Sequence, residues 1–139
     1  METGTSYLVD TNIWLERLLE QEKSEIAARF LDLTPPKNLF ISDFSLHSIG
    51  LILTKLGRSE ILEQFIEDLF IHAQIELLTT DPLDLLDVSA NIKTFKLDFD
   101  DAYQLTVAQK YELTIVTFDK DFNAHGIQKQ SPEEALAGK

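Results

Sequence analysis

Short apolar runs alternate with longer amphipathic segments along the chain, and each kind has its own period. The apolar runs predict strands over residues 6–9, 38–42, 75–80 and 113–119, with a weaker strand near 126–129. Apolar residues at helical spacing predict helices over residues 11–19, 22–33, 43–56, 58–73, 82–95 and 97–112. The end of the chain, over 132–136, shows neither pattern clearly and is expected to be frayed.

Local signals mark several element ends. Thr34-Pro35-Pro36 stops the helix before it, and Gly57 suits the left-handed position after a helix. Ser42 or Asp43 is placed to cap the helix over 43–56. Asp81-Pro82 resembles an N-cap followed by proline at the first helical position, so we expect the helix over 82–95 to begin there.

Strands that alternate with one or two helices predict a parallel sheet. No Asn-Gly hairpin signal interrupts the pattern, so we expect an α/β fold with four to five parallel strands between two layers of helices. We expect one domain over residues 1–139, because the chain has no low-complexity linker. In such folds the functional site lies beyond the carboxyl ends of the strands.

Acidic residues follow the predicted strands where each strand ends. Asp10 follows the first strand, Asp43 follows the second, and Asp119 and Asp121 follow the strand over 113–119. Parallel strands bring these positions to one edge of the sheet. Each acid alone has a structural interpretation, since Asp commonly caps helices and occupies turns. The ordered set is what predicts a site.

A second acidic group opens the helix over 97–112. Asp98 is a candidate cap, and Asp100 and Asp101 fall in the first turn, where acids interact favourably with the helix dipole. Carboxylates gathered at one edge disfavour one another's charge, and a divalent cation removes that cost. Mg²⁺ and Mn²⁺ prefer hard oxygen ligands, and a metal-bound water is a better nucleophile. The acids therefore predict metal-assisted phosphodiester hydrolysis.

Composition narrows the alternatives. The net charge of −12, from 24 acidic and 12 basic residues, argues against binding nucleic acid by charge alone, but it is compatible with an enzyme that holds phosphate through cations. The absence of cysteine excludes disulfides and thiolate sites. The apolar runs are too short to span a membrane and no signal peptide is visible, so we expect a cytoplasmic protein.

Other catalytic patterns have little support. His47, His72 and His125 are widely separated and form no zinc motif, and there is no glycine-rich phosphate loop or Gly-x-Ser-x-Gly elbow. A phosphatase or phosphotransfer domain would place Asp-x-Asp after the first strand, whereas Asn12 occupies the second of those positions.

Two segments resemble the PIN domain, a metal-dependent ribonuclease domain found in many bacterial and archaeal toxins of the VapC type. YLVDTNIWL resembles the family's opening strand with its first catalytic aspartate, which is Asp10 here. LDFDDAYQLTVAQKYELTIVTFDKDF resembles the C-terminal signature, in which Asp-Ala opens a helix, a strand follows, and Thr-x-Asp-x-x-Phe comes next. The residues that match this signature are Asp101-Ala102, Thr117, Asp119, Asp121 and Phe122. Together the segments extend the resemblance over nearly the whole chain.

One position departs from the family pattern. The family usually has a Glu in the context Ile-Ser-x-x-x-x-x-Glu, and the position that aligns with it here is Ser48. Serine cannot supply the negative charge, so the resemblance implies the fold more firmly than the activity. Asp43, Asp100 and Asp121 are candidates to compensate.

The resemblance implies that Asp10, Asp101 and Asp119 bind Mg²⁺ or Mn²⁺ and catalyse RNA cleavage. Supporting roles are expected for Asn12, Ser48, Asp100, Thr117 and Asp121. A toxin of this type also implies an antitoxin partner and a homodimer. The missing Glu leaves a second interpretation open, a PIN domain that binds RNA or protein with little or no catalysis.

Overall fold

Five parallel strands form the centre of the computed structural model, which describes residues 4–120 and 126–138. The strands are β1 (Tyr7–Val9), β2 (Leu39–Ser42), β3 (Glu76–Leu78), β4 (Thr114–Val116) and β5 (Lys129–Gln130). Their order across the sheet is β3-β2-β1-β4-β5, and every neighbouring pair is parallel. The predicted α/β fold with a parallel sheet of four to five strands is confirmed.

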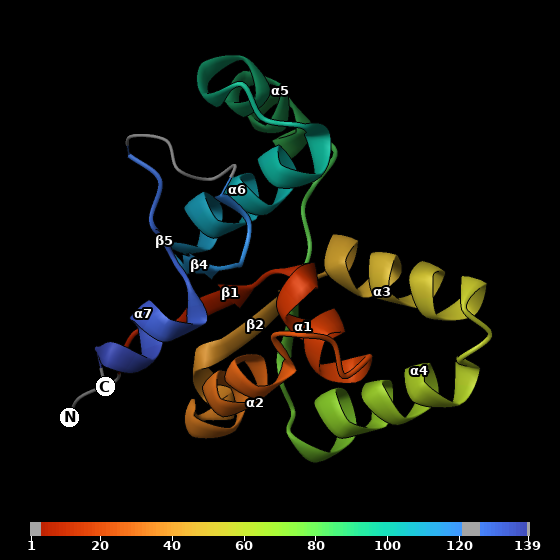
Figure 1. The fold of residues 1–139 in the computed structure, drawn as a ribbon. Coiled ribbons are helices and arrows are strands. Elements are labelled where there is room, and N and C mark those ends of the chain that lie inside the picture. Colours follow the sequence, from red (N-terminus) through yellow and green to blue (C-terminus); the bar gives the residue numbers. More distant parts are fainter. Residues whose placement is uncertain (1–3, 121–125, 139) are drawn as a thin grey trace.

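Helices cover both faces of this sheet (Figure 1). They are α1 (Thr11–Leu18), α2 (Ser24–Leu33), α3 (Asp43–Lys55), α4 (Ser59–Ile66), α5 (Asp84–Phe95), α6 (Phe99–Tyr111) and α7 (Pro132–Ala137), with the 3-10 helix η1 (Pro36–Asn38) and the π-helix η2 (Glu67–His72). Within residues 4–120 and 126–138, every helix is too short or too polar to cross a lipid bilayer.

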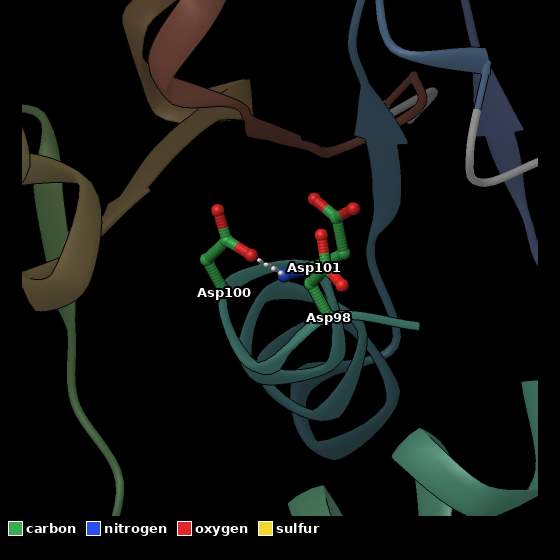
Figure 2. A group of neighbouring side chains, drawn as sticks. All are labelled: Asp98, Asp100 and Asp101. Atoms are coloured by element: carbon green, nitrogen blue, oxygen red, sulfur yellow. Dashed lines mark hydrogen bonds between the residues drawn. The ribbon is translucent and has the colours of Figure 1, made fainter. Parts of the chain in front are cut away.

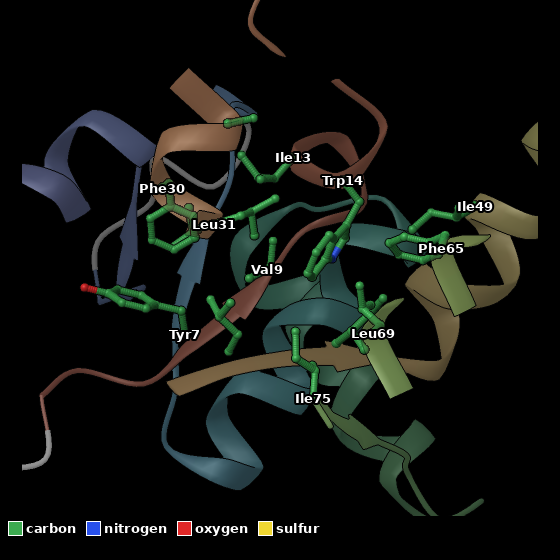
Figure 3. Packing of buried hydrophobic residues seen from close by; sticks show 14 of the residues in the cluster. Tyr7, Val9, Ile13, Trp14, Phe30, Leu31, Ile49, Phe65, Leu69 and Ile75 are labelled. Atoms are coloured by element: carbon green, nitrogen blue, oxygen red, sulfur yellow. The ribbon is translucent and has the colours of Figure 1, made fainter. Parts of the chain in front are cut away.

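Alternation along β1 divides the core into two parts, as a strand between two helical layers requires. Tyr7 and Val9 point to one face and pack with residues of α1, α2, α3, α4 and α7, and Figure 3 shows this cluster around Trp14 and Phe30. Leu8 points to the other face and packs with residues of α5 and α6. Because both faces of β1 are buried, the strand is apolar throughout and its polar successor, Asp10, marks the edge of the sheet.

Three local predictions are wrong, and a fourth is refined. The helix expected to begin at Asp81-Pro82 begins at Asp84, because the backbone just before it forms i→i−3 turns, with the Asp84 N–H bonded to the Asp81 carbonyl at 2.9 Å. The weak strand expected near 126–129 is shifted to Lys129–Gln130, where it pairs with β4.

The helix expected over 58–73 changes at Glu67 from α4 to the π-helix η2, in which the Ala73 N–H bonds to the Asp68 carbonyl. The end expected to be frayed is instead the helix α7, because Ser131 and Glu134 cap each other reciprocally.

Candidate active site

The carboxyl ends of β1, β2 and β4 lie at one edge of the sheet. The register sets Val9 beside Val116, and the Asp10 N–H extends this ladder with a 3.0 Å hydrogen bond to the Val116 carbonyl. Asp10, Ser42 and Thr117 are the last or next residues of these strands, and all three are buried. The strand topology thus brings together side chains that are far apart in the sequence.

Asp10 is held by three donors from three parts of the chain. Its Oδ1 accepts from the Thr11 N–H at 2.8 Å and from Gln104 Nε2 at 3.0 Å, and its Oδ2 accepts from the Thr117 hydroxyl at 2.8 Å. The first of these bonds makes Asp10 the N-cap of α1. A cap requires only that first bond, so the other two show that the position of this carboxylate is fixed for more than capping.

Burial raises the pKa of the Asp10 carboxyl above its usual value, and the three hydrogen bonds oppose that rise. The nearby charge of Asp119 raises the pKa further. Asp10 and Asp119 are therefore close enough to repel each other. A buried carboxylate beside a second acid is a site at which a cation would stabilise the charged form.

Thr117 links the end of β4 to the start of α1. Its hydroxyl donates to Asp10 and accepts from Asn12 Nδ2 at 3.2 Å and from the Asp119 N–H at 2.9 Å. Asn12 Oδ1 in turn accepts from the Phe118 N–H at 3.3 Å. The Thr117 hydroxyl has used its one proton and both lone pairs, so these contacts favour a role in holding Asp10 rather than in orienting a water. Asn12 supports Asp10 through Thr117.

Gln104 is the residue of this site that sequence reasoning missed. It lies on α6 with 1% of its surface exposed, donates to Asp10, and is bound by side chains of β2 and α3. A signal was available, because Gln104 follows Asp101 by three residues and so shares its helix face. An uncharged polar residue on an inward face implies a buried hydrogen-bond partner.

The first turn of α6 carries a cluster of three carboxylates, Asp98, Asp100 and Asp101, whose oxygens lie within 4.8 Å of one another. Figure 2 shows them extending from the same end of the helix. Asp98 occupies the N-cap position, although its side chain makes no capping bond among the described residues, whereas Asp100 accepts from the Asp101 N–H at 3.0 Å. Asp101 is buried and the other two are exposed. The cluster places two exposed negative charges beside a buried one.

Of the three predicted ligands, the structure shows an interaction between Asp10 and Asp119. Asp119 influences the pKa of Asp10, whereas Asp101 belongs to the cluster at the start of α6. Within the described residues, the only group of three or more acids or histidines with ligand atoms that close is the cluster on α6. Mg²⁺ often keeps several waters, and ligands that act through water are spaced more widely than this. Convergence of the trio on one ion therefore stays a prediction.

Asp43, the candidate at the end of β2, is engaged from α6. Its Oδ1 accepts from the Tyr103 hydroxyl at 2.8 Å and from the Phe44 N–H at 2.8 Å. Tyr103 and Thr80 share a further hydrogen bond of 2.9 Å, which ties the end of β3 to the same group. Burial first, and then Asp43, raise the pKa of the Tyr103 phenol, so the phenol remains a donor to Asp43.

The remaining expected residues fall at two places. Ser48 lies on α3, half-buried and one helical turn after Ser45, which contacts Gln104. Asp121 lies outside the described residues.

The comparison with known families identifies the family of this chain. The model of the PIN domain matches residues 7–127, so the chain belongs to the PIN domain family. Comparison with curated proteins gives no significant match.

Solved structures with the same fold include several toxins. A toxin–antitoxin complex from Klebsiella pneumoniae is 21% identical with a TM-score of 0.74, and the match covers 91% of this chain and 98% of that one. VapC20 of Mycobacterium tuberculosis, described as a toxin that cleaves the sarcin–ricin loop, is 20% identical with a TM-score of 0.72, covering 88% and 96%. VapBC-1 of nontypeable Haemophilus influenzae is 22% identical with a TM-score of 0.67, covering 93% and 99%.

The donor set at this edge fits a hard divalent cation. All the candidate ligands are carboxylate oxygens, which Mg²⁺ and Mn²⁺ prefer, and histidine and cysteine ligands typical of softer ions are lacking from this part of the described chain. The repulsion between Asp10 and Asp119 is a cost that such an ion would remove.

Proposed function

We propose that this PIN domain is a Mg²⁺- or Mn²⁺-dependent ribonuclease that cleaves RNA endonucleolytically. The observation that carries the proposal is Asp10, a buried carboxylate held by three donors beside the charge of Asp119. Such an arrangement is expensive for a folded protein and is understandable when a cation binds there. The described cleavage of RNA by a toxin of similar fold supports the same reaction class.

In this proposal all three acids bind the cation, from different elements of the fold. Asp10 and Asp119 bind it from the strand ends, and Asp101 contributes from α6, directly or through water. When bound, the cation supplies an activated water and offsets the negative charge that develops on the phosphate. Thr117 and Asn12 hold the Asp10 carboxylate in place, and Asp100 adds negative potential. The cation also lets a chain of net charge −12 approach a polyanion.

Serine at position 48, in place of the family's Glu, should lower the rate of RNA cleavage. A metal site with one carboxylate fewer compensates less of the ion's charge and binds it more weakly, but Mg²⁺ often needs only one or two carboxylates. We therefore expect cleavage that is slow, requires high metal concentration, or favours Mn²⁺. The second candidate function, a PIN domain that binds RNA or protein without cleaving, rests on this same Ser48.

The test of catalysis uses purified protein, single-stranded RNA and a metal titration with EDTA controls. Asp10→Asn keeps the shape of the side chain and removes its charge, so cleavage should cease. Cleavage that survives both EDTA and Asp10→Asn would indicate a contaminant or another mechanism. No cleavage at any metal concentration, with no gain from Ser48→Glu, would favour the binding function.

We further propose a protein partner of the antitoxin kind, a homodimer, and action in the cytoplasm. Similar folds come from toxin–antitoxin complexes, which supports the partner. An apolar groove of about 520 Å³ between α1, α2 and the α4–η2 segment is a suitable surface, and its walls include Trp14, Leu18, Leu31, Phe65 and Leu69. Trp14 lies in a wall of this groove, so its indole can report on a partner that binds there. Light scattering of the purified chain tests the dimer.

A further inference from the structure

The Gln104 side chain connects three elements of the site, and each of its polar atoms forms a hydrogen bond within the protein. Its Oε1 accepts from the Ser42 hydroxyl at 2.6 Å, and its Nε2 donates to Asp10 Oδ1 at 3.0 Å and to Ser45 Oγ at 2.8 Å. Both amide protons and the carbonyl oxygen therefore have partners within the protein. A buried amide with every partner in place is held in one orientation, so it can fix the groups that it contacts.

The two carboxylate oxygens of Asp10 differ in the number of lone pairs that remain free to bind a ligand. A carboxylate oxygen offers two lone pairs, and on Oδ1 both are taken, by the Thr11 N–H and by Gln104 Nε2. On Oδ2 one is taken, by the Thr117 hydroxyl. One lone pair of Oδ2 thus remains for a ligand from outside, and a cation cannot be chelated by both oxygens while Gln104 keeps its place.

We propose that Gln104 is a positioning residue that sets the metal selectivity of the site, because by occupying Oδ1 it restricts Asp10 to coordination through Oδ2. This inference rests on the proposed function, since it requires a divalent cation at Asp10. Mg²⁺ takes a compact octahedral shell in which a carboxylate supplies one oxygen, whereas Ca²⁺ takes six to eight oxygens and accepts carboxylates in bidentate mode. A carboxylate restricted to one oxygen therefore favours Mg²⁺ over Ca²⁺.

Core packing alone does not explain why a glutamine occupies position 104, whereas a role in positioning Asp10 does. An apolar residue would fill the space on α6 without having to satisfy three polar groups. The network also joins Asp10 to Ser42 and Ser45, which lie on β2 and α3. The position of the Asp10 carboxylate is thus fixed relative to the helix that carries Ser48.

The test compares Mg²⁺ and Ca²⁺ binding by isothermal titration calorimetry, with no RNA present. Gln104→Leu and Gln104→Met remove the donor to Oδ1 and replace it with an apolar side chain of similar volume. The ratio of Ca²⁺ affinity to Mg²⁺ affinity should rise by about tenfold, the value of one lost hydrogen bond. Gln109→Leu is the control, because Gln109 lies on the same helix but is exposed and accepts its hydrogen bond from Asn91.

Circular dichroism and thermal unfolding establish that each variant is folded at the temperature of the titration. Should both Gln104 variants unfold, Ser45→Ala replaces them, because it removes an acceptor that steadies Gln104 and should raise the same ratio by a smaller factor. An unchanged ratio in the folded variants, with Mg²⁺ still bound, would overturn the selectivity role alone. A wild-type chain that binds none of Mg²⁺, Mn²⁺ and Ca²⁺ at saturating concentration would overturn the proposed function and the selectivity role together.

Discussion

The Thr117 hydroxyl donates a 2.8 Å hydrogen bond to Asp10 Oδ2, which joins residues 107 positions apart in the sequence. The same hydroxyl accepts from Asn12 and from the Asp119 N–H, so one small side chain organises the end of β4 around the end of β1. Parallel pairing of these strands makes the contact possible. The site is therefore a product of the topology rather than of any contiguous motif.

Removing this hydroxyl should cost stability. Thr117→Val keeps the shape and leaves the Asp119 N–H and Asn12 without an acceptor, so we expect a loss of about 1–3 kcal/mol in the free energy of unfolding. Urea unfolding measures it. Thr114→Val, at the start of β4 and only partly buried, is the matched control. Equal unfolding free energies for the two variants would show that the network contributes nothing.

The buried charge of Asp10 should make stability depend on pH. A raised pKa means that the folded state binds the proton more tightly than the unfolded state does, so the penalty is absent below the unfolded value of 3.8 and grows as pH rises toward the folded pKa. In the absence of divalent ions, the stability of Asp10→Asn relative to wild type should increase with pH above that value. Urea unfolding at several pH values measures the difference, and a flat difference would contradict the raised pKa.

Restoring a carboxylate at Ser48 should strengthen metal binding. Ser48 follows Ser45 by one helical turn, and Ser45 contacts the amide that holds Asp10, so Ser48→Glu adds charge on the side of α3 that faces the site. We expect Mn²⁺ affinity to rise by about tenfold, as for one added charged ligand. His47→Glu adds the same charge at an exposed neighbouring position and should change little. Equal gains in both variants would indicate a nonspecific effect of charge.

The groove beside Trp14 offers its own spectroscopic probe, because the chain has a single tryptophan. Binding of a candidate antitoxin should change Trp14 fluorescence, because the partner would exclude water from the groove that Trp14 lines. Leu18→Glu, which places a charge in the groove wall at a partly buried position, should weaken binding at least about tenfold. Binding that leaves the fluorescence unchanged and tolerates this substitution would place the partner elsewhere.

The fold could be predicted from the sequence alone, because its buried strands and its helix caps are both clearly marked in the sequence. The strand β1 is apolar on both faces, as a strand between two helical layers must be, and α3 has an oxygen cap at Ser42. The boundary predicted at Asp81-Pro82 was wrong because the backbone there forms i→i−3 turns before α-helical bonding begins at Asp84. The balance between such turns and an α-helix depends on local geometry that composition does not reveal.

Prediction of the site was less complete. Asp10 was found because it follows a recognisable strand, and Thr117 because it matches the family's C-terminal signature. Gln104 belongs to no motif, and only its spacing from Asp101 marks it in the sequence. Its importance arises from contacts with β1, β2 and α3, which are known only once the strands are arranged. Tyr103 was missed for the same reason, since its contact with Asp43 spans 60 positions.

A structure of the protein with Mn²⁺ bound, located by its anomalous signal, tests the central claim most directly. We expect the ion to lie against Asp10 Oδ2, with Asp101 and Asp119 bound to it or to its waters, and to be absent from Asp10→Asn. An ion held only by Asp98 and Asp100, away from Asp10, or no ion at saturating Mn²⁺, would contradict the account.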